Sequence, residues 1–357
     1  MTSFYKDKTV FITGCTGFKG TWLCKLLLEL DVEQIIGYSL EPPTDPSIYE
    51  FTELQKEDKF IFIKGDILNY SQLEAVILAY KPDIVIHLAA QPIVLIGYEQ
   101  PRLTYETNVM GTVNLLSACV NEPSVKTILN VTTDKVYENL ELDEPFKETD
   151  RLNGFDPYSN SKSCSELVTS CYYNSFLKDR TVITARAGNV IGGGDFAPHR
   201  IVVDSVESLS KMQPIEVRNP YSTRPYQFVL EAVYAYLYII EKTFNTNKFY
   251  NYNVGPDYQN VIQTKDLADM ICECWSPKNP GWINICPQTS VENVPHEAGK
   301  LTLDCTKIKE ELNWKPTLNI HKTVQWTVDW YSNFYADKDI TDKQIKKFLK
   351  EVEKWNS

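Results

Sequence analysis

The stretch "TVFITGCTGFKG", residues 9–20, decides the fold of this 357-residue chain. Its first five residues form a short apolar run of strand type, and Gly14, Gly17 and Gly20 follow directly. Glycine lets the backbone turn sharply and approach a pyrophosphate closely. The apolar spacing of residues 21–30 predicts a helix whose N-terminus presents free N–H groups to an anion. Strand, glycine turn and helix in this order predict a dinucleotide-binding unit.

Short apolar strands alternate with helices through the first half of the chain. The pattern predicts strands at 35–39, 60–66, 83–90, 126–133 and 181–188, and helices at 71–80, 101–120 and 157–178. Such alternation is typical of a parallel, doubly wound sheet with right-handed crossovers. The predicted fold class is therefore α/β, a Rossmann sheet with a smaller, interwoven C-terminal lobe.

The alternation weakens after about residue 189, where loop-like stretches surround helices predicted at 230–244 and 341–355. We expect residues 1–188 to form the dinucleotide-binding Rossmann domain, open to contributions from later strands. Residues 189–357 would form the substrate-binding lobe and end in an amphipathic C-terminal helix.

The overall charge excludes broad binding to nucleic acid or to an anionic membrane. The formal net charge is −11, and both of those partners require a cationic surface. A local anion site is still compatible with this charge, because three of the seven arginines, the residue best suited to phosphate, lie between residues 200 and 224. On count alone, chance and surface ion pairs explain this grouping equally well.

The cysteines and histidines favour neither a disulfide framework nor a metal site. The nine cysteines include no CxxC spacing, and there are only four histidines. The start of the chain has no signal-peptide pattern, and no uncharged apolar run is long enough to span a bilayer. We therefore predict a cytoplasmic protein without a bound metal.

Two further stretches carry groups suited to acid/base chemistry. "NVTTDKVYEN" (130–139) ends a predicted strand with Thr133, Asp134 and Lys135. In "DPYSNSK" (156–162), Tyr158 and Lys162 are four residues apart, on one face of the predicted helix. A protonated lysine beside a phenol lowers its pKa, which would make Tyr158 an acid/base group near neutral pH. The plainer interpretation of Asp134 and Lys135 is a salt-bridged pair that only ends a strand.

With these motifs in place, the chain resembles the extended short-chain dehydrogenase/reductase family. Within it, the chain is similar to the group of sugar-nucleotide 4,6-dehydratases that act on CDP-glucose. The resemblance runs over nearly the whole sequence, and its specific motifs are "HLAAQP", "TNVMGTVNLL", "TTDKVYEN", "DPYSNSK", "RAGNVIGGGD" and "RNPYSTRPYQFV". It implies an NAD cofactor, a CDP-glucose substrate, a homodimer, and a role in making 6-deoxysugars for lipopolysaccharide O-antigen or capsule.

The resemblance also implies roles for individual residues. The implied catalytic residues are Thr133, Asp134, Lys135, Tyr158 and Lys162. The implied cofactor-binding residues are Gly14, Thr16, Gly17, Phe18, Lys19, Gly20, Asp66, Ile67, Leu88, Ala89, Ala90, Asn108, Thr132, Tyr158 and Lys162. The implied substrate-binding residues are Gln91, Thr133, Asn189, Arg200, Arg218 and Arg224, with Arg224 the main contact to the diphosphate.

The end of the second strand bears on the choice of dinucleotide. An acid there would hold the adenine ribose, but Tyr38, Ser39 and Leu40 precede the first acid, Glu41. No arginine stands there to hold a 2′-phosphate, so the sequence favours NAD and leaves NADP open. Asp66 is either a contact to the adenine amine or an ordinary turn-forming residue, and the two readings weigh equally.

In the implied reaction, NAD takes a hydride from C4 of the sugar while Tyr158, assisted by Thr133, takes the 4-hydroxyl proton. Lys135 then removes the C5 proton and Asp134 protonates the departing C6 hydroxyl. Both roles require burial to move the pKa of each group towards neutrality. Two alternatives stay open: a 4,6-dehydratase of another nucleotide hexose, and a nucleotide-sugar 4-epimerase, which would have no use for an acid at Asp134.

Four positions depart from the pattern of the group. Cys15 stands where histidine is usual, Leu95 where arginine is usual, and Tyr226 and Phe228 where tryptophan and histidine are common. We expect these residues on the substrate side. The implied dimer would join the helix within 101–120 and the helix bearing Tyr158 to their copies, through Val113, Leu116, Leu167 and Cys171.

Overall fold

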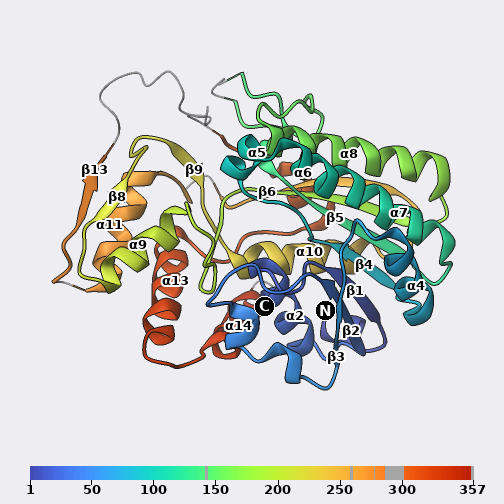
Figure 1. Cartoon of the computed structure of the whole chain (residues 1–357), viewed down its shortest axis with the longest axis horizontal. Coiled ribbons are helices and arrows are strands. Elements are labelled where there is room, and N and C mark those ends of the chain that lie inside the picture. Colours follow the sequence, from blue (N-terminus) through green and yellow to red (C-terminus); the bar gives the residue numbers. More distant parts are fainter. Residues whose placement is uncertain (141–143, 258–259, 277, 286–300, 355–357) are drawn as a thin grey trace.

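The computed structural model describes residues 1–140, 144–257, 260–276, 278–285 and 301–354. Its main feature is a seven-stranded sheet in the order β11-β6-β5-β4-β1-β2-β3, in which every pairing is parallel (Figure 1). The strands are β1 Thr9–Thr13, β2 Gln34–Ser39, β3 Phe60–Lys64, β4 Ile84–His87, β5 Thr127–Thr133, β6 Thr181–Ala187 and β11 Phe249–Val254. The predicted doubly wound Rossmann sheet is confirmed.

The fourteen α-helices found in the described part of the chain lie between these strands and after them. They are α1 Thr2–Tyr5, α2 Phe18–Glu29, α3 Ile48–Phe51, α4 Tyr70–Tyr80, α5 Val94–Glu99, α6 Pro101–Tyr105, α7 Gly111–Asn121, α8 Pro157–Phe176, α9 Ile201–Ser210, α10 Val229–Thr243, α11 Thr264–Trp275, α12 Thr306–Leu312, α13 Ile320–Phe334 and α14 Thr341–Glu353. Three short turns of other helix types are η1 Leu54–Lys56, η2 Glu106–Met110 and η3 Asp134–Val136.

Both faces of the sheet are buried, as expected for strands that read as continuous apolar runs. In β1, Val10 and Ile12 point into one core and Phe11 into the other. Helices α4, α7 and α8 cover the Phe11 face, while α2 and α10 cover the opposite face (Figure 1). Because the strands are parallel, their C-terminal ends meet at one edge, and the polar residues that follow each strand are brought together there.

The second half of the chain contributes to both parts of the molecule. Strand β11 extends the sheet beside β6, and α14 returns to pack on α2. The remaining lobe contains α9, α11 and α13 and three two-stranded pairings (Figure 1). Their strands are β7 Val190–Ile191 with β10 Gln227–Phe228, β8 Ile215–Val217 with β13 Trp282–Asn284, and β9 Thr223–Pro225 with β12 Val261–Gln263. Residues 189–357 are thus interwoven with the sheet.

The helix predicted over 101–120 is divided into three parts. Between α6 and α7 the chain widens into one π-helical segment, η2. Asn108 lies inside it, and its side chain bonds the backbone of Gln91 and the hydroxyl of Ser161. A π segment of this kind often marks a functional position in a helix.

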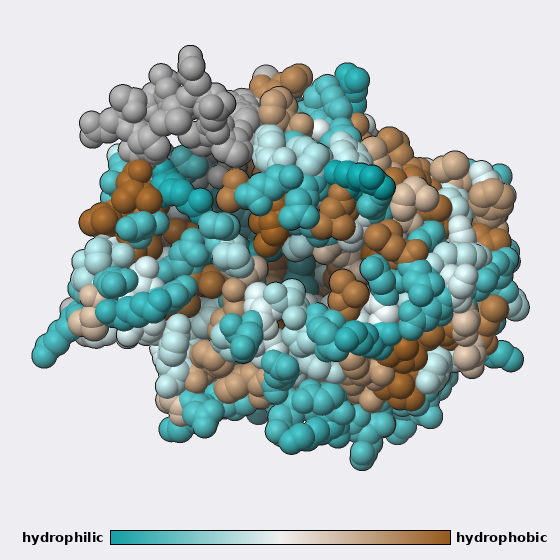
Figure 2. Space-filling model, viewed as in Figure 1, coloured by the Kyte–Doolittle hydropathy of each residue, from teal (hydrophilic) through white to brown (hydrophobic). Residues whose placement is uncertain are grey.

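One residue of the predicted dimer face lies elsewhere. Leu116 is only 1% exposed and packs into the core beneath the sheet, so its placement on the outer surface was wrong. Leu167 is 56% exposed on α8, and Cys171 is exposed on the same helix. Leu103, Met110 and Phe176 are further exposed apolar residues on or beside these helices, and Figure 2 shows apolar surface over this side of the molecule.

Candidate active site

The glycine turn sits between β1 and α2 at the C-terminal edge of the sheet. Gly14 has a φ of +75°, and a Cβ there would come within 2.7 Å of the backbone nitrogen of Ala89. A Cβ on Gly20 would lie 2.1 Å from the carbonyl oxygen of Gly14. Gly17 caps α2 without a side chain, so no cap side chain covers the first N–H groups of the helix. This arrangement suits the diphosphate of a dinucleotide.

Other predicted cofactor residues surround this turn. Thr16 hydrogen-bonds to Ser39 and donates to the carbonyl of Leu40, which joins the turn to the end of β2. Asp66 is exposed and accepts a bond from the N–H of Leu68, a turn geometry that leaves its second oxygen for another partner. The neighbouring predicted residues Ile67, Leu88, Ala89 and Ala90 are buried or partly buried at the ends of β3 and β4. Phe18 and Lys19 are partly buried in the first turn of α2.

Gln91 and Asn108 hold the loop after β4 in place. The amide of Gln91 donates to Thr104, and its carbonyl oxygen accepts from the N–H of Ile93. Asn108, in turn, binds both the N–H and the C=O of Gln91. Both ends of the Gln91 side chain therefore make bonds inside the protein, which fix the shape of the loop.

Thr133, Asp134 and Tyr158 meet where β5 ends and α8 begins. The Thr133 hydroxyl donates to Asp134 Oδ1 over 2.9 Å, and it lies close enough to the phenol of Tyr158 to act on the pKa of that phenol. Asp134 is buried, and its Oδ2 has no hydrogen-bond partner among the described residues. A buried carboxyl oxygen without a partner is unfavourable by itself, so it marks a place where a ligand group could bind.

The pKa of Tyr158 differs from the sequence-based expectation. Burial raises it to about 12, although the hydrogen bond to Thr133 and the charge of Arg200 act in the opposite direction. Burial and the nearby charge of Lys19 lower the pKa of Lys162 to about 8, while Glu166 raises it. The expected lowering of the Tyr158 pKa by Lys162 is thus not found: desolvation of the phenol is the largest effect, and Lys162 is not among the groups that shift this pKa.

A hollow, called the main hollow below, opens beside Asp134 and has about 570 Å³ of space, which includes space open to solvent. Its lining residues are Val94, Asp134, Lys135, Tyr137, Asn139, Phe146, Phe155, Asp156, Ser159, Arg224 and Leu301. Lys135 is half-buried, and among the described residues no ion pair joins it to Asp134. The plainer interpretation, in which the two residues form a salt bridge, is therefore not what the structure shows.

Several residues of this hollow were not predicted, yet the quoted motifs contain signals for them. Tyr137 and Asn139 stand two and four residues after Lys135 in "TTDKVYEN", and Asp156 and Ser159 lie within two residues of Tyr158. Asp156 caps α8 by accepting from the N–H of Ser159, so it fixes the start of the helix that carries Tyr158. Aromatic residues at this hollow are compatible with a sugar or base packing against them.

The predicted arginines have different positions. Arg224 is 4% exposed, and it lines the hollow. Arg200 lies 3.2 Å from Asp195 and is close enough to Tyr158 and Lys19 for its charge to affect both. Arg218 is half exposed and 3.9 Å from Asp204, and it is not part of the lining of the hollow. Asn189 is partly buried, and its carbonyl accepts from the N–H of Gln227.

Three of the four departures, Cys15, Tyr226 and Phe228, lie in the core and not on the substrate side as expected. Cys15 is buried against Gly37, where a Cβ would come within 2.6 Å of its sulfur. Phe228 is fully buried between Trp22 and Trp326. Tyr226 is also buried, and its hydroxyl lies 3.4 Å from Thr264. Leu95 is partly buried in α5, next to Val94 of the hollow.

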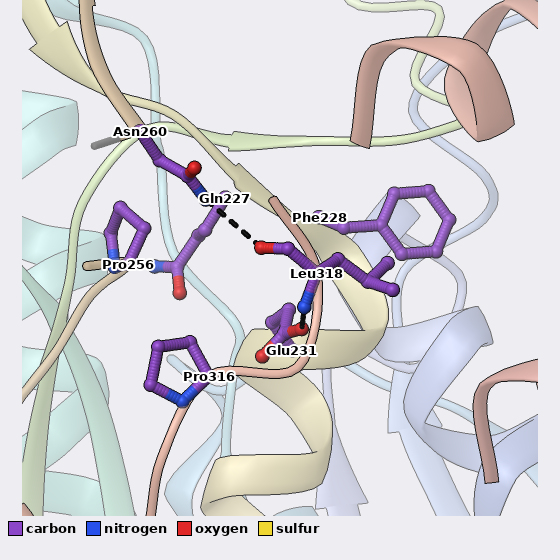
Figure 3. Close-up of a pocket in the computed structure, with 7 residues that line it drawn as sticks. All are labelled: Gln227, Phe228, Glu231, Pro256, Asn260, Pro316 and Leu318. Carbon is purple, nitrogen blue, oxygen red and sulfur yellow. Dashed lines mark hydrogen bonds between the residues drawn. The ribbon is translucent and has the colours of Figure 1, made fainter. Parts of the chain in front are cut away.

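A second, smaller hollow contains none of the predicted site residues (Figure 3). It is lined by Gln227, Phe228, Glu231, Pro256, Asn260, Pro316 and Leu318. The Glu231 carboxylate accepts from the N–H groups of Thr317 and Leu318, and Asn260 donates to the carbonyl of Leu318. These bonds anchor the segment that leads into α13.

The described residues contain no group of three His, Cys, Asp or Glu side chains that could hold a metal ion. Among the described helices, none is both long and apolar enough to cross a membrane.

The fold and the site define a class of protein, the Rossmann-fold enzymes that carry a tyrosine and a lysine at the end of the sheet. The sequence profile described as GDP-mannose 4,6 dehydratase matches residues 11–327. CDP-glucose 4,6-dehydratase of Salmonella typhimurium is 38% identical over 347 residues, which cover 95% of this chain and 94% of that protein. The chain therefore belongs to the GDP-mannose 4,6 dehydratase family, and the predicted resemblance to sugar-nucleotide dehydratases is confirmed.

More distant relatives agree with this assignment. The dTDP-glucose 4,6-dehydratase of Haemophilus influenzae is 27% identical, with 90% of this chain and 97% of that protein covered. The structure of dTDP-glucose 4,6-dehydratase from Bacillus anthracis in complex with NAD has a TM-score of 0.76 at 23% identity, over 92% of this chain and 98% of that one. The structure of UDP-glucose 4-epimerase from Thermotoga maritima has a TM-score of 0.78 at 22% identity, over 92% of this chain and 99% of that one. These two structures confirm the fold.

Proposed function

We propose that this chain is an NAD-dependent 4,6-dehydratase that converts CDP-glucose to CDP-4-keto-6-deoxyglucose and water. The observation that carries the proposal is the buried carboxyl of Asp134, bonded to Thr133 through one oxygen and lacking a described partner on the other. It faces the hollow that also contains Lys135 and Arg224. The identity of 38% to a CDP-glucose 4,6-dehydratase supports the choice of nucleotide sugar.

The residues around the glycine turn suit a bound dinucleotide. Gly17 leaves the N-terminus of α2 uncovered by a cap side chain, and Lys19 adds a partly buried cation beside it. When bound, NAD accepts a hydride from C4 of the sugar and returns it to C6. Tyr158, as a phenolate that protonated Lys162 stabilises, takes the proton of the C4 hydroxyl and becomes a phenol, with the Thr133 hydroxyl beside it. The main contribution of Arg224 is to bind the diphosphate.

Elimination of water needs two more proton transfers. Once C4 is a ketone, the C5 proton is acidic, and Lys135 is placed in the hollow to remove it. Asp134, in its protonated form, gives its proton to the C6 hydroxyl, which leaves as water. Lys135 then returns its proton to C5 when C6 is reduced.

Proton balance gives Thr133 a further role. After one reaction cycle, Tyr158 holds one proton more than at the start, and Asp134 holds one fewer. The Thr133 hydroxyl donates to Asp134 and lies close to the Tyr158 phenol, so it can pass a proton from the phenol to the carboxylate. The three residues are thereby returned to their starting states without a net exchange with solvent.

A nucleotide-sugar 4-epimerase is the alternative, because the fold is shared with an epimerase. An epimerase would also use Thr133, Tyr158 and Lys162, but it has no step for a carboxylic acid at Asp134. The burial of that acid against the hollow therefore favours the dehydratase.

One experiment separates these activities. The purified protein is incubated with CDP-glucose, and the products are examined for the 4-keto chromophore in alkali. We expect that chromophore and a product lighter by one water, whereas an epimerase would give an isomer of unchanged mass. Parallel incubations with dTDP-, UDP- and GDP-hexoses test which nucleotide base the enzyme accepts. Equal turnover of all four nucleotide sugars would refute the specificity for CDP-glucose.

We also propose that the enzyme is a homodimer that acts in the cytoplasm. The exposed apolar side chains of Leu167, Leu103 and Met110 support a protein partner on the face formed by α6, η2 and α8. Val113 is only partly buried on α7 and borders the same face. The cytoplasmic location rests on the sequence features given above, above all the odd number of cysteines.

A further inference from the structure

A fully buried ion pair lies behind the proposed catalytic residues. Glu166 of α8 and Arg186 of β6 are each about 2% exposed. Their contact is bidentate: Arg186 Nε donates to Oε1 and Nη2 to Oε2, each over 3.0 Å. Removing two charges from water is costly, and an apolar pair would often be at least as stable. The position of this pair therefore calls for a role beyond stability.

The Glu166 side of the pair joins α8 to the end of β5. Glu166 accepts a hydrogen bond from the hydroxyl of Thr132, which directly precedes Thr133. One helical turn earlier, Lys162 donates to the carbonyl of Val131 over 3.1 Å. Two consecutive residues of β5 are thus tied to two successive turns of α8, so the distance between Thr133 and the Tyr158–Lys162 helix is fixed.

The Arg186 side reaches the wall of the main hollow. Arg186 Nη1 donates to the hydroxyl of Tyr137 over 2.8 Å, and the guanidinium lies 5.0 Å from the centroid of the Tyr137 ring. Tyr137 donates to Asn253 of β11 and stacks on Phe146, with centroids 4.9 Å apart. Tyr137 and Phe146 both line the hollow beside Lys135.

We infer that the Glu166–Arg186 pair positions the catalytic groups, with Glu166 supporting the Thr133–Lys162 side and Arg186 supporting the Tyr137 wall of the substrate hollow. The functional meaning of this inference rests on the proposed function, but the titration and unfolding measurements that test it do not. Neither residue touches the reacting atoms, and both are positioning residues.

The charge of Glu166 gives the inference a measurable consequence. The charged and titratable groups that face Lys162 are Lys19 from α2, His87 from β4, and Tyr158 and Glu166 from its own helix. Of these, Glu166 favours the protonated ammonium and Lys19 opposes it. Replacing Glu166 with glutamine keeps the shape and removes this support, so Lys162 should lose its proton at lower pH.

The test follows Lys162 directly. Protein labelled with ¹³Cε-lysine is titrated by NMR without substrate, and the signal of Lys162 is assigned by its loss in Lys162→Arg. In Glu166→Gln, we expect the midpoint of the Lys162 titration to fall by about one pH unit. The alkaline limb of the pH profile of kcat should move to lower pH by the same amount. Glu231→Gln, which replaces a buried carboxyl group on another helix, α10, should leave the midpoint unchanged.

A double variant separates charge from stability. Arg186→Met leaves Glu166 buried without its partner and should lower the unfolding temperature strongly. The double variant Glu166→Gln/Arg186→Met should recover most of the lost unfolding temperature. If the double variant regains stability and its Lys162 titrates as in the wild type, the pair is only structural and the inference is overturned. A shifted titration in a stable double variant supports the inference even if CDP-glucose proves to be the wrong substrate.

The Tyr137 side has its own readout. Tyr137→Phe keeps the ring and removes its bonds to Arg186 and Asn253. We expect KM for the nucleotide sugar to rise about three- to tenfold with little change in kcat, since the two buried hydrogen bonds that hold the Tyr137 ring at the wall are lost. An unchanged KM would show that Arg186 does not support the substrate hollow through Tyr137.

Discussion

We expect the carboxyl of Asp134 to determine how far the proposed reaction proceeds. Asp134→Asn keeps the shape of the side chain but cannot give a carboxylic proton to the C6 hydroxyl. We expect bound NADH to appear on mixing with substrate, seen as absorbance of the reduced nicotinamide, while product formation falls about 10²- to 10⁴-fold. Tyr158→Phe is the matched comparison, because it should prevent even the first reduction of NAD. Full turnover by Asp134→Asn would assign the acid to another residue.

Lys135 is tested by the fate of the C5 hydrogen. Lys135→Met keeps the length of the side chain and removes the base. Deuterium at C5 should be retained in this variant, whereas in Asp134→Asn it should still wash out to solvent, because the base is intact. Mass spectrometry of recovered substrate distinguishes the two. If Lys135→Met turns over at a near-normal rate, the lysine only shapes the hollow.

Arg224 is expected to act on the substrate and not on the cofactor. Arg224→Ala removes a charge-assisted contact to the diphosphate, which typically costs about 1.5–3 kcal/mol of binding free energy. Calorimetry should show weaker binding of the nucleotide sugar and unchanged affinity for NAD. Arg102→Ala, at a highly exposed position on α6, is the control and should change neither affinity. A loss confined to NAD would place Arg224 at the other ligand.

For individual residues, the sequence indicates the proposed reacting groups better than the residues that position them. Thr133 and Tyr158 could be proposed from the sequence because one ends and the other begins an element that the apolar pattern predicts. Glu166 and Arg186 could not be paired, because their contact depends on how α8 lies across β6, which no local pattern encodes. The pKa of Tyr158 was misjudged for a related reason, since burial of the phenol is set by the whole site.

Among the elements, the strands of the sheet could be predicted closely because each is a short apolar run at the centre of the fold. Helix α7 was harder, since Val113, Leu115, Leu116 and Cys119 make it apolar on more than one side. The outward face could not be chosen from such a pattern, and Leu116 was assigned to the wrong one. The small strand pairings of the second lobe have two or three residues each, too few for a periodic signal.

Helix α10 and the segment before α13 are joined by a carboxylate with a pH-dependent effect. Burial raises the pKa of Glu231 from its ordinary value of 4.5 to about 8, despite bonds from the N–H groups of Thr317 and Leu318. Between pH 4.5 and 8 the folded chain holds a proton that the unfolded chain has released. This contribution to the free energy of unfolding is complete below pH 4.5 and is lost as the pH rises through 8.

The Glu231→Gln variant should therefore show a weaker fall in stability across this range than the wild type, by an amount on the order of a few kcal/mol. Urea unfolding at several pH values measures the difference. Glu207→Gln removes an exposed carboxylate of α9 and is the control, because it should leave the pH dependence unchanged. Identical pH profiles for Glu231→Gln and the wild type would contradict the raised pKa.

At the scale of the whole molecule, the exposed apolar face predicts self-association. We expect a dimer by sedimentation at micromolar concentration. Leu167→Asp places a charge in that face and should give a monomer that still folds. Leu78→Asp, at an exposed leucine of α4, should leave the dimer intact. A wild-type protein that sediments as a monomer would refute the homodimer.

The position of β11 has a consequence for biosynthesis. Strand β6 ends at residue 187, but its outer neighbour begins only at residue 249. On the ribosome, six strands of the sheet emerge first, and the edge of β6 waits unpaired until more than sixty further residues have been translated. A nascent chain stalled before residue 249 should therefore recruit holdase chaperones, and release should coincide with the emergence of β11 from the exit tunnel.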